Sequence, residues 1–531
     1  MIIVREATLA DVPGIREVFQ SEYGDHYAYP QYYDTDALAR LVYADATVLL
    51  VAVDGDSDRV AGTASVVFSV GAYNDLVGEF GRLVVHPDFR CRGIGNQLMH
   101  GRVQRVESRL HVGIVENRAA HTFSQRISTR YGFAPIGFIP QKLKLARRES
   151  VVPFVRYFGE ALALRRNHPR IIPEVSMLAA FALDNCGLPQ DAIIDDTSAP
   201  LPYGDDFELD ELRTEGYASL LRIERGRLRH REVFGPIRLH YGLFQLQARH
   251  SHYLIARRRK QIAGGIGFMI DEAEKAIRVF ELIALSDEPV RFLFESLLRK
   301  CQRELDVEYL EVDVSAYSPP MQRTLLELGF LPVSYVPANV FHEVERLDAI
   351  KMARLLVPLD LGKVDFHDTV RPIAEAVVDS FTSKEVLPRM AAASHQAPLF
   401  DGLSDEQRQR LLAIGTARSF QPGEPLYRKG EADGTMHLIL DGEVDLMADG
   451  SRKVGCLSTG QCVGETSLLN PPQSAPAHSV DALASTIVET AAFGNQQFHE
   501  LIRRRPDIGV VIYRNLATDI STKLKNLGQR G

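Results

Sequence analysis

Cysteine is scarce in this sequence of 531 residues, which argues against a disulfide framework and against a zinc site. The cysteines form no CxxC pair and stand far apart, at Cys91, Cys186, Cys301, Cys456 and Cys462. Scattered cysteines in odd number are typical of a reducing compartment and offer no four-ligand cluster. We therefore expect a cytoplasmic protein without a bound metal.

Long apolar runs are missing as well. No run of about 18 apolar residues occurs, and a helix needs that length to cross a membrane. The opening residues, MIIVREATLADV, contain no charged region followed by an apolar stretch, so we expect no signal peptide. The net charge of −8 argues against a general binder of nucleic acid or membrane surfaces.

The rest of the composition is ordinary for globular domains. Hydrophobic residues make up 45% of the chain and charged residues 24%, which lets each domain bury its own core. The length predicts three or four domains. Residues 1–148 alternate between strand-like and helix-like patterns and so form a first α/β domain. We expect strands over 2–5, 48–53, 60–68, 79–85 and 110–115, and helices over 11–19, 96–107 and 119–130.

The stretch HPDFRCRGIG, residues 86–95, joins a predicted strand to a predicted helix. A helix start gathers free backbone N–H groups and partial positive charge around one point. Gly93 and Gly95 would let the backbone approach a ligand closely, and Arg90 and Arg92 could supply charge-assisted hydrogen bonds. The stretch is neither a P-loop nor GxGxxG. It predicts a pyrophosphate site, and the alternative is an ordinary turn with two solvated arginines.

This turn resembles that of the GNAT family of acyl-CoA-dependent N-acyltransferases. The family motif is Gln/Arg-x-x-Gly-x-Gly/Ala, which Arg90, Gly93 and Gly95 match, and LVVHP at 83–87 resembles the family's fourth strand. The resemblance covers about residues 1–145. It implies an α/β fold with a mixed sheet. It also implies that the co-substrate is acetyl-CoA, the acetylated form of coenzyme A, and that the acyl group is transferred directly to an amine. The coenzyme contacts it implies are Leu83, Val84, Val85, Arg90, Cys91, Arg92, Gly93, Ile94, Gly95, Asn96 and Ser124.

Direct transfer needs a base for the amine proton and an acid for the leaving thiolate. Glu79, at the start of the strand before the turn, is the candidate base. Many family members carry an acid tyrosine four residues before Gly-Phe, where this sequence has Ser128, a much poorer acid. Tyr131 adjoins that glycine but would point elsewhere on a helix. His121, in HTFSQ, stands where members often carry asparagine. The catalytic candidates are therefore Glu79, His121, Ser128 and Tyr131, and for each the alternative is no role.

Before this core lies SEYGDHYAYPQYYD, residues 21–34, with five tyrosines. In the family, the first helices and their loop cover the acceptor site. Such an aromatic stretch could hold an amine by cation–π contacts. The alternative is that its rings pack the helix pair.

Residues 149–364 repeat the order of the first domain, and YGF at 131–133 has a counterpart in LGF at 328–330. This indicates an internal duplication. The loop that corresponds to the turn, ELIALSDEPVRFLFE, has no glycine and carries Asp287 and Glu288, which would repel a pyrophosphate. We expect a degenerate second GNAT-like domain that has lost the coenzyme site and shapes a cleft with the first.

After a helical connector, 365–398, residues 399–531 resemble the cyclic nucleotide-binding domain family. LFDGLSDEQ, FQPGEPLYRKGE, MHLILDGEVDLM and VGETSLL carry the resemblance, which implies a small antiparallel β-barrel with flanking helices. The family's cassette begins with Gly-Glu and ends with an arginine for the cyclic phosphate, a position that Pro476 holds here. Losing that bond costs on the order of 1.5–3 kcal/mol, so we doubt tight binding of a cyclic nucleotide. The ligand candidates are Gly464, Glu465, Thr466, Ser467 and His478.

The last predicted helix, 506–527, is not followed by a helix-turn-helix, so we expect no sequence-specific DNA binding. Its apolar side could form a homodimer. Two basic stretches, 225–231 and 256–261, fit a solvated strand face and a turn better than a nucleic-acid surface in an acidic protein. The sequence therefore predicts an N-acyltransferase that acts on an amine, a small molecule or a protein lysine, with a sensor-like C-terminal domain. The alternative is a non-catalytic regulatory or scaffold protein that binds acyl-CoA.

Overall fold

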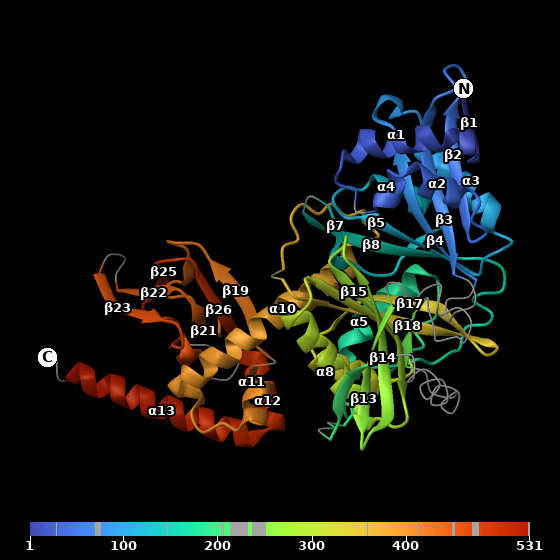
Figure 1. Ribbon diagram of the computed structural model, residues 1–531. Helices are drawn as coiled ribbons and strands as arrows, with labels where there is room; N and C mark the ends of the chain where they lie inside the picture. The colour runs from blue at the N-terminus through green and yellow to red at the C-terminus, as the bar shows by residue number, and fades with distance from the viewer. Residues whose placement is uncertain are drawn as a thin grey trace. The chain divides into compact units, whose positions relative to one another are not determined.

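A computed structural model of the chain gives two compact units, Met1–Val378 and Asp379–Gly531 (Figure 1). The structure describes residues 1–27, 29–69, 76–145, 147–202, 204, 206–212, 232–235, 251–357, 359–412, 414–448, 452–469 and 477–528. The basic stretch at 225–231 and the cassette position Pro476 lie outside these residues. In the described part, no helix has both the length and the hydropathy for crossing a membrane.

The first half of the first unit is built on an eight-stranded mixed sheet. The order is β1-β2-β3-β4-β5-β8-β6, and β7 pairs with β8. Only β4 and β5 run parallel, and the other neighbours are antiparallel. The strands are β1 (Ile2–Glu6), β2 (Thr47–Asp54), β3 (Val60–Ser69), β4 (Val77–Val85), β5 (Val112–Arg118), β6 (Ala134–Pro135), β7 (Ile139–Lys144) and β8 (Arg148–Tyr157).

Helices cover both faces of this sheet. Helix α1 (Val12–Tyr23) buries residues at helical spacing, among them Ile15 and Phe19, against Leu49 and Val51 of β2. Helix α3 (Ile94–Val106) approaches Leu50, which points to the opposite face because side chains alternate along a strand. Helices α2 (Thr35–Val42) and α4 (Phe123–Arg130) complete the two layers.

The second half repeats this arrangement. Its sheet has the order β11-β13-β14-β15-β16-β18-β17, with β12 paired to β16, and its parallel pair, β15 and β16, stands where β4 and β5 stand in the first sheet. The shared order is what an internal duplication requires. The strands are β11 (Glu208–Glu211), β12 (Val233–Phe234), β13 (Ser251–Arg258), β14 (Gln261–Asp271), β15 (Ala276–Ala284), β16 (Tyr309–Ser315), β17 (Leu331–His342) and β18 (Glu345–Leu355). The helices of this unit after α4 are α5 (Pro173–Asn185), α8 (Glu288–Arg303), α9 (Pro319–Glu327) and the start of α10 (Arg371–Gln396).

Strand β8 belongs to the first sheet. The sequence pattern indicated that a second domain begins near residue 149. However, β8 pairs with β5, from Val112 opposite Tyr157 to Arg118 opposite Val151. The first sheet therefore extends to Tyr157. The boundary between the two halves stays a prediction.

The two halves of this unit are joined by direct bonds. Backbone N–H groups of Phe138 and Tyr335 donate to Val333 and Ile136 across the halves, both at 2.9 Å. A side chain of α4 also forms hydrogen bonds to residues 365–367, the segment that follows the second half. Gln125 Nε2 donates to the Asp365 carbonyl and Gln125 Oε1 accepts from the His367 N–H, both at 2.9 Å.

The second unit contains two four-stranded antiparallel sheets, β19-β26-β21-β24 and β20-β25-β22-β23. Their bounds are β19 (Thr416–Phe420), β20 (Pro425–Tyr427), β21 (Thr435–Asp441), β22 (Glu443–Ala448), β23 (Arg452–Ser458), β24 (Cys462–Val463), β25 (Asp481–Ala484) and β26 (Val488–Gly494). Helices α11 (Asp405–Leu412), α12 (Asn495–Arg504) and α13 (Pro506–Gly528) flank them. The antiparallel β-architecture expected from the sequence is confirmed, with the described strands in two sheets.

Helix α13 packs on its own unit. Ile508, Ile512 and Leu516 are fully buried in a core that also holds Phe400 and Leu403. These three positions, which the sequence suggested for a dimer, are therefore already covered. The homodimer stays a prediction that would need other surface.

Candidate functional site

The parallel strands of the first sheet separate along their length. β4 and β5 pair only at Val77–Val112, Gly78–Gly113 and Glu79–Ile114, although both continue for several residues. In the described part of the chain, no strand enters the gap between them. The separated segments therefore keep backbone groups on their facing edges that a bound chain-like molecule could pair with.

The turn 86–95 follows the separated part of β4. After the short helix η3 (Pro87–Phe89), Cys91 and Gly93 have φ of 64° and 73°, and Gly93 caps α3. The first backbone bonds of the helix run from Asn96 and Gln97 to the Gly93 carbonyl, at 3.1 and 3.2 Å. Within the described residues, the N–H groups of 91–95 have no acceptor. The turn thus presents five unpaired donors at a helix start, the arrangement that anions favour.

The two glycines of the turn differ in their surroundings. A Cβ on Gly93 would meet nothing within 4 Å, so this residue borders open space. A Cβ on Gly95 would stand 3.0 Å from Ile127 Cδ1 of α4 and 3.6 Å from Leu83 Cδ2 of β4. Gly95 therefore lets α3 pack closely on the sheet and α4, whereas Gly93 leaves room beside the turn.

Both arginines of the turn are already paired with acids. Arg90 forms an ion pair with Glu22 near the end of α1. Arg92 lies 3.9 Å from Asp54 and places its guanidinium 5.1 Å from the centroid of the Phe89 ring. The side chains of Arg90 and Arg92 are 56% and 52% exposed, so a phosphate could reach them. Glu22 was not predicted, because only the fold brings the end of α1 beside this turn.

Helix α4 gives Ser128 and Tyr131 other neighbours than the sequence suggested. Ser128 is fully buried, and its hydroxyl accepts a hydrogen bond of 2.9 Å from Asn117 Nδ2 on β5. The Tyr131 ring lies 6.1 Å from the ring of His100 on α3. A catalytic role for either residue stays a prediction. The hydrogen bond to Asn117 occupies the Ser128 hydroxyl, which does not favour such a role for Ser128.

The beginning of α4 carries polar atoms without partners. His121 Nδ1 and Ser124 Oγ are buried and have no hydrogen-bond partner among the described residues. Burial lowers the pKa of His121 and the Arg118 guanidinium lowers it further, so the imidazole is neutral at pH 7. Buried polar atoms without partners are costly, which is consistent with a ligand at this place.

Glu79, the candidate base, is 58% exposed and forms a 2.7 Å ion pair with Arg82. The Arg82 guanidinium in turn lies 5.9 Å from the centroid of Tyr29. Other rings of the aromatic stretch pack together, since Tyr27 and Tyr32 stand 4.9 and 4.5 Å from Phe19. The tyrosines thus pack the helix layer, and Tyr27, Tyr29 and Tyr32 also lie near the charged pair.

The corresponding gap in the second sheet is filled. β15 and β16 pair from Ala276 opposite Tyr309 to Val279 opposite Val312. Beyond this point β12 pairs with β16, with Val233 opposite Val314 and Phe234 opposite Asp313. Phe234 is 1% exposed, and a Cβ on Gly235 would stand 2.4 Å from Phe280 of β15. A segment of the chain itself therefore occupies the place that is open in the first sheet.

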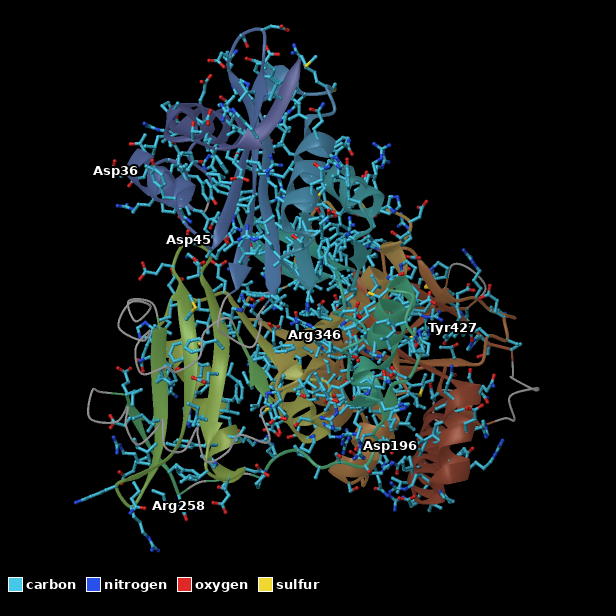
Figure 2. All side chains as sticks on the ribbon, turned by 90° about the vertical axis from the view of Figure 1, so that its right-hand side faces the viewer. Asp36, Asp45, Asp196, Arg258, Arg346 and Tyr427 are labelled. Carbon is cyan, nitrogen blue, oxygen red and sulfur yellow. The ribbon has the colours of Figure 1, made fainter. Side chains whose placement is uncertain are left out.

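In the second unit, one predicted ligand residue, His478, stacks on a tyrosine, and another, Gly464, lies beside the two rings. The His478 ring lies 3.6 Å from that of Tyr427, labelled in Figure 2, and His478 Nε2 lies 2.9 Å from Asp433 Oδ1. Gly464 (φ 77°) caps the short helix η6 (Glu465–Leu468), which also contains Thr466 and Ser467. A Cβ on Gly464 would stand 2.7 Å from the Thr435 carbonyl. Its contact with Asp433 means that His478 already has an acidic partner, and a role for it in ligand binding stays a prediction.

Comparison with known proteins identifies two domains. The acetyltransferase (GNAT) domain profile matches residues 45–134, and the cyclic nucleotide-binding domain profile matches residues 417–505. Among curated proteins, glutaminase 1 of Bradyrhizobium diazoefficiens is 26% identical over 163 residues. That match covers 31% of this chain and 22% of the relative, so it spans about a fifth of the relative's length.

Solved structures resemble each part separately. A putative acetyltransferase of Salmonella typhimurium, solved with its cofactor acetyl-CoA, is 20% identical and covers 30% of this chain and 95% of its own, with a TM-score of 0.27. A ribosomal-protein-alanine N-acetyltransferase of Brucella melitensis is 21% identical and covers 29% and 99%, with a TM-score of 0.26. The catabolite activator protein of Thermus thermophilus is 26% identical and covers 25% and 61%, with a TM-score of 0.23.

Proposed function

Because the chain carries a GNAT acetyltransferase domain and a cyclic nucleotide-binding domain, we propose that it is an acyl-CoA-dependent N-acyltransferase. The donor is acetyl-CoA, the acceptor is an amine, and the second unit has a regulatory role. The observation that carries the proposal is the turn 91–95, with five unpaired backbone donors beside the open space at Gly93.

The residues present fit this co-substrate. The N–H groups of 91–95 would bind the pyrophosphate, with Arg90 exchanging Glu22 for a phosphate oxygen. The facing edges of β4 and β5 would pair with the pantetheine amides, which places Leu83, Val84 and Val85 along the arm. When bound, the co-substrate supplies an activated thioester.

The chemistry of the chain's own residues is limited to moving protons and stabilising charge. Glu79 would accept the proton that the amine nitrogen loses as the C–N bond forms and the C–S bond breaks. The departing thiolate then needs one proton. His121 could donate it only as the imidazolium, which burial and Arg118 disfavour by lowering its pKa, and Ser128 is held by Asn117. Water is therefore the simplest source of this proton, with the unpartnered Nδ1 of His121 placed to orient it.

The test of this function follows free thiol. We expect the protein to release thiol from acetyl-CoA only when an acceptor from an amine library is added. Arg90→Ala and Gly93→Ala should reduce the release at low coenzyme concentration by about tenfold or more, because the first removes a contact to the phosphates and the second places a methyl group in their space. Arg40→Ala, on the exposed side of α2, is the control and should change nothing.

One outcome would favour the alternative function. If coenzyme A binds and no amine produces thiol, the chain is an acyl-CoA-binding regulatory protein. The hydrogen bond between Ser128 and Asn117 is consistent with that outcome, because it occupies the hydroxyl at the position of the family's acid tyrosine.

The filled gap of the second half leads to a prediction about stoichiometry. Calorimetric titration with coenzyme A should give one site per chain, because β12 occupies the second gap. Arg90→Ala should weaken that one site. Arg258→Ala, which removes the 2.6 Å ion pair to Glu288 at the corresponding helix start, should leave it unchanged. Two sites of similar affinity would contradict the role assigned to β12.

A further inference from the structure

The β14–β15 hairpin of the second half reaches the first half. The Lys144 N–H on β7 donates to Glu274 Oε2 at 2.5 Å, and Arg148 Nη2 on β8 donates to the Lys275 carbonyl at 3.2 Å. Lys144 and Arg148 also bind Glu308, at 3.1 and 2.6 Å. Figure 1 shows β15 beginning beside β7. The turn of this hairpin, residues 271–275, is therefore held against the first sheet.

Charged side chains of both halves gather beside this turn, and the cations among them are paired. Lys142 of β7 lies 2.6 Å from Glu116 of β5 and 3.2 Å from Glu311 of β16. Arg278 of β15 lies 3.6 Å from Glu311 and 3.4 Å from Asp313. With the Arg82–Glu79 pair on β4, each of these three cations already has a carboxylate within ion-pair distance.

Carboxylate oxygens of the turn, in contrast, are left over. Glu274 is 7% exposed, and its Oε1 is buried without a hydrogen-bond partner among the described residues. Asp271 is half-buried, and within the described ranges its Oδ1 accepts one hydrogen bond, from the Glu274 N–H at 3.0 Å. Burial raises the pKa of Glu274 to about 7, because the Lys144 N–H and the charges of Arg148 and Lys142 offset only part of the lost hydration. A buried carboxylate in this state would gain from a cation supplied by a ligand.

The turn also lies close to the candidate base of the first half. The connection runs through β5 and β7: Glu79 pairs with Ile114, and Glu116, on the same face of β5, binds Lys142 of β7 at 2.6 Å. Burial raises the pKa of the Tyr29 hydroxyl, and the charges of Glu274, Glu79 and Asp271 raise it further. The Arg82 guanidinium, paired with Glu79, lies 5.9 Å from the centroid of the Tyr29 ring. The acids of the turn and Glu79 thus all act electrostatically on Tyr29.

We propose that Asp271 and Glu274 of the second half complete the acceptor site of the first half and select an amine that carries a second positive charge. The chemical class is a small aliphatic diamine or polyamine. One ammonium group is held by the turn acids, and the other nitrogen, deprotonated, faces Glu79. This proposal rests on the proposed function. The second half has no open coenzyme gap of its own, and the proposal gives it a role in binding the acceptor instead.

The test measures binding apart from turnover. In calorimetry with the full chain and coenzyme A, putrescine should bind about tenfold or more tightly than butylamine, which has the same carbon chain and one charge. Glu274→Gln and Asp271→Asn should each remove most of this preference while leaving butylamine unchanged. Glu272→Gln is the matched control, because Glu272 is exposed on the same turn. If Glu274→Gln does not fold, Asp271→Asn alone decides.

The outcomes separate this proposal from the proposed function. Equal binding of the two amines, or a preference that survives both substitutions, overturns the assignment of the turn even if thiol is released. A preference that the substitutions abolish supports the assignment even if no thiol appears, and in that case the acyltransferase function is what fails.

Discussion

Replacing Gly93 by alanine is expected to weaken coenzyme A binding by at least about tenfold, or about 1.4 kcal/mol. A Cβ at this position meets no protein atom within 4 Å, so it would project into the space above the five unpaired N–H groups. The φ of 73° adds about 1–2 kcal/mol of backbone strain in the folded state. Calorimetric titration with coenzyme A measures the affinity, and chemical denaturation measures the strain.

The chain offers a matched control for this substitution. Gly132, after α4, has a φ of 75° and also borders open space. Gly132→Ala should therefore lower the free energy of unfolding by a similar amount and leave the affinity unchanged. Equal losses of affinity in the two variants would mean that strain, and not contact with the ligand, explains the effect at Gly93.

Asp348→Ala is expected to lower the stability of the first unit by about 3–5 kcal/mol. Asp348 is fully buried on β18 and accepts from Arg165 Nη2 and from the Tyr335 hydroxyl, both at 2.6 Å, and from the Ala338 N–H at 2.8 Å. Without it, two donors lose their acceptor and Arg165 keeps only Asp191, at 3.0 Å. Buried charges and donors without partners account for the largest effects of single substitutions.

Urea denaturation of the full chain, followed by amide exchange in the first unit, measures this loss. Glu345→Ala, at the exposed start of the same strand, is the control and should change stability by less than about 0.5 kcal/mol. A loss below about 1 kcal/mol at Asp348 would show that water enters and satisfies Arg165 and Tyr335.

Local patterns made much of the first half predictable. Alternating and helical spacing identified β2, β3, β4, α3 and α4 to within a few residues, because their burial follows from neighbours along the chain. The turn 86–95 was predictable for the same reason. Its donors and its glycines lie within ten consecutive residues, and a helix start presents N–H groups whatever surrounds it.

What could not be predicted depends on residues far apart in the sequence. The ion pair between Glu22 and Arg90 forms only when α1 packs beside the turn. The hydrogen bond from Asn117 to the Ser128 hydroxyl likewise needs β5 and α4 to be packed together. The acids Asp287 and Glu288 pointed to a lost coenzyme site in the second half, but no local signal placed Phe234 in the gap. The contact between Glu274 and Lys144 joins residues 130 positions apart, a separation that no periodic pattern carries.

The bond between Gln125 and residues 365–367 bears on how this protein can be divided for study. A fragment that ends at Tyr157, where the first sheet ends, would leave Gln125 Oε1 without its donor. Gln125 Nε2 would lose its 2.9 Å acceptor and keep only the longer bonds to the His121 and Arg118 carbonyls, at 3.2 and 3.4 Å. It would also expose Phe138, which packs against Phe366 with ring centroids 5.3 Å apart. The smallest piece with a complete first half is therefore the whole first unit, and a domain dissection of this chain should cut after α10 begins.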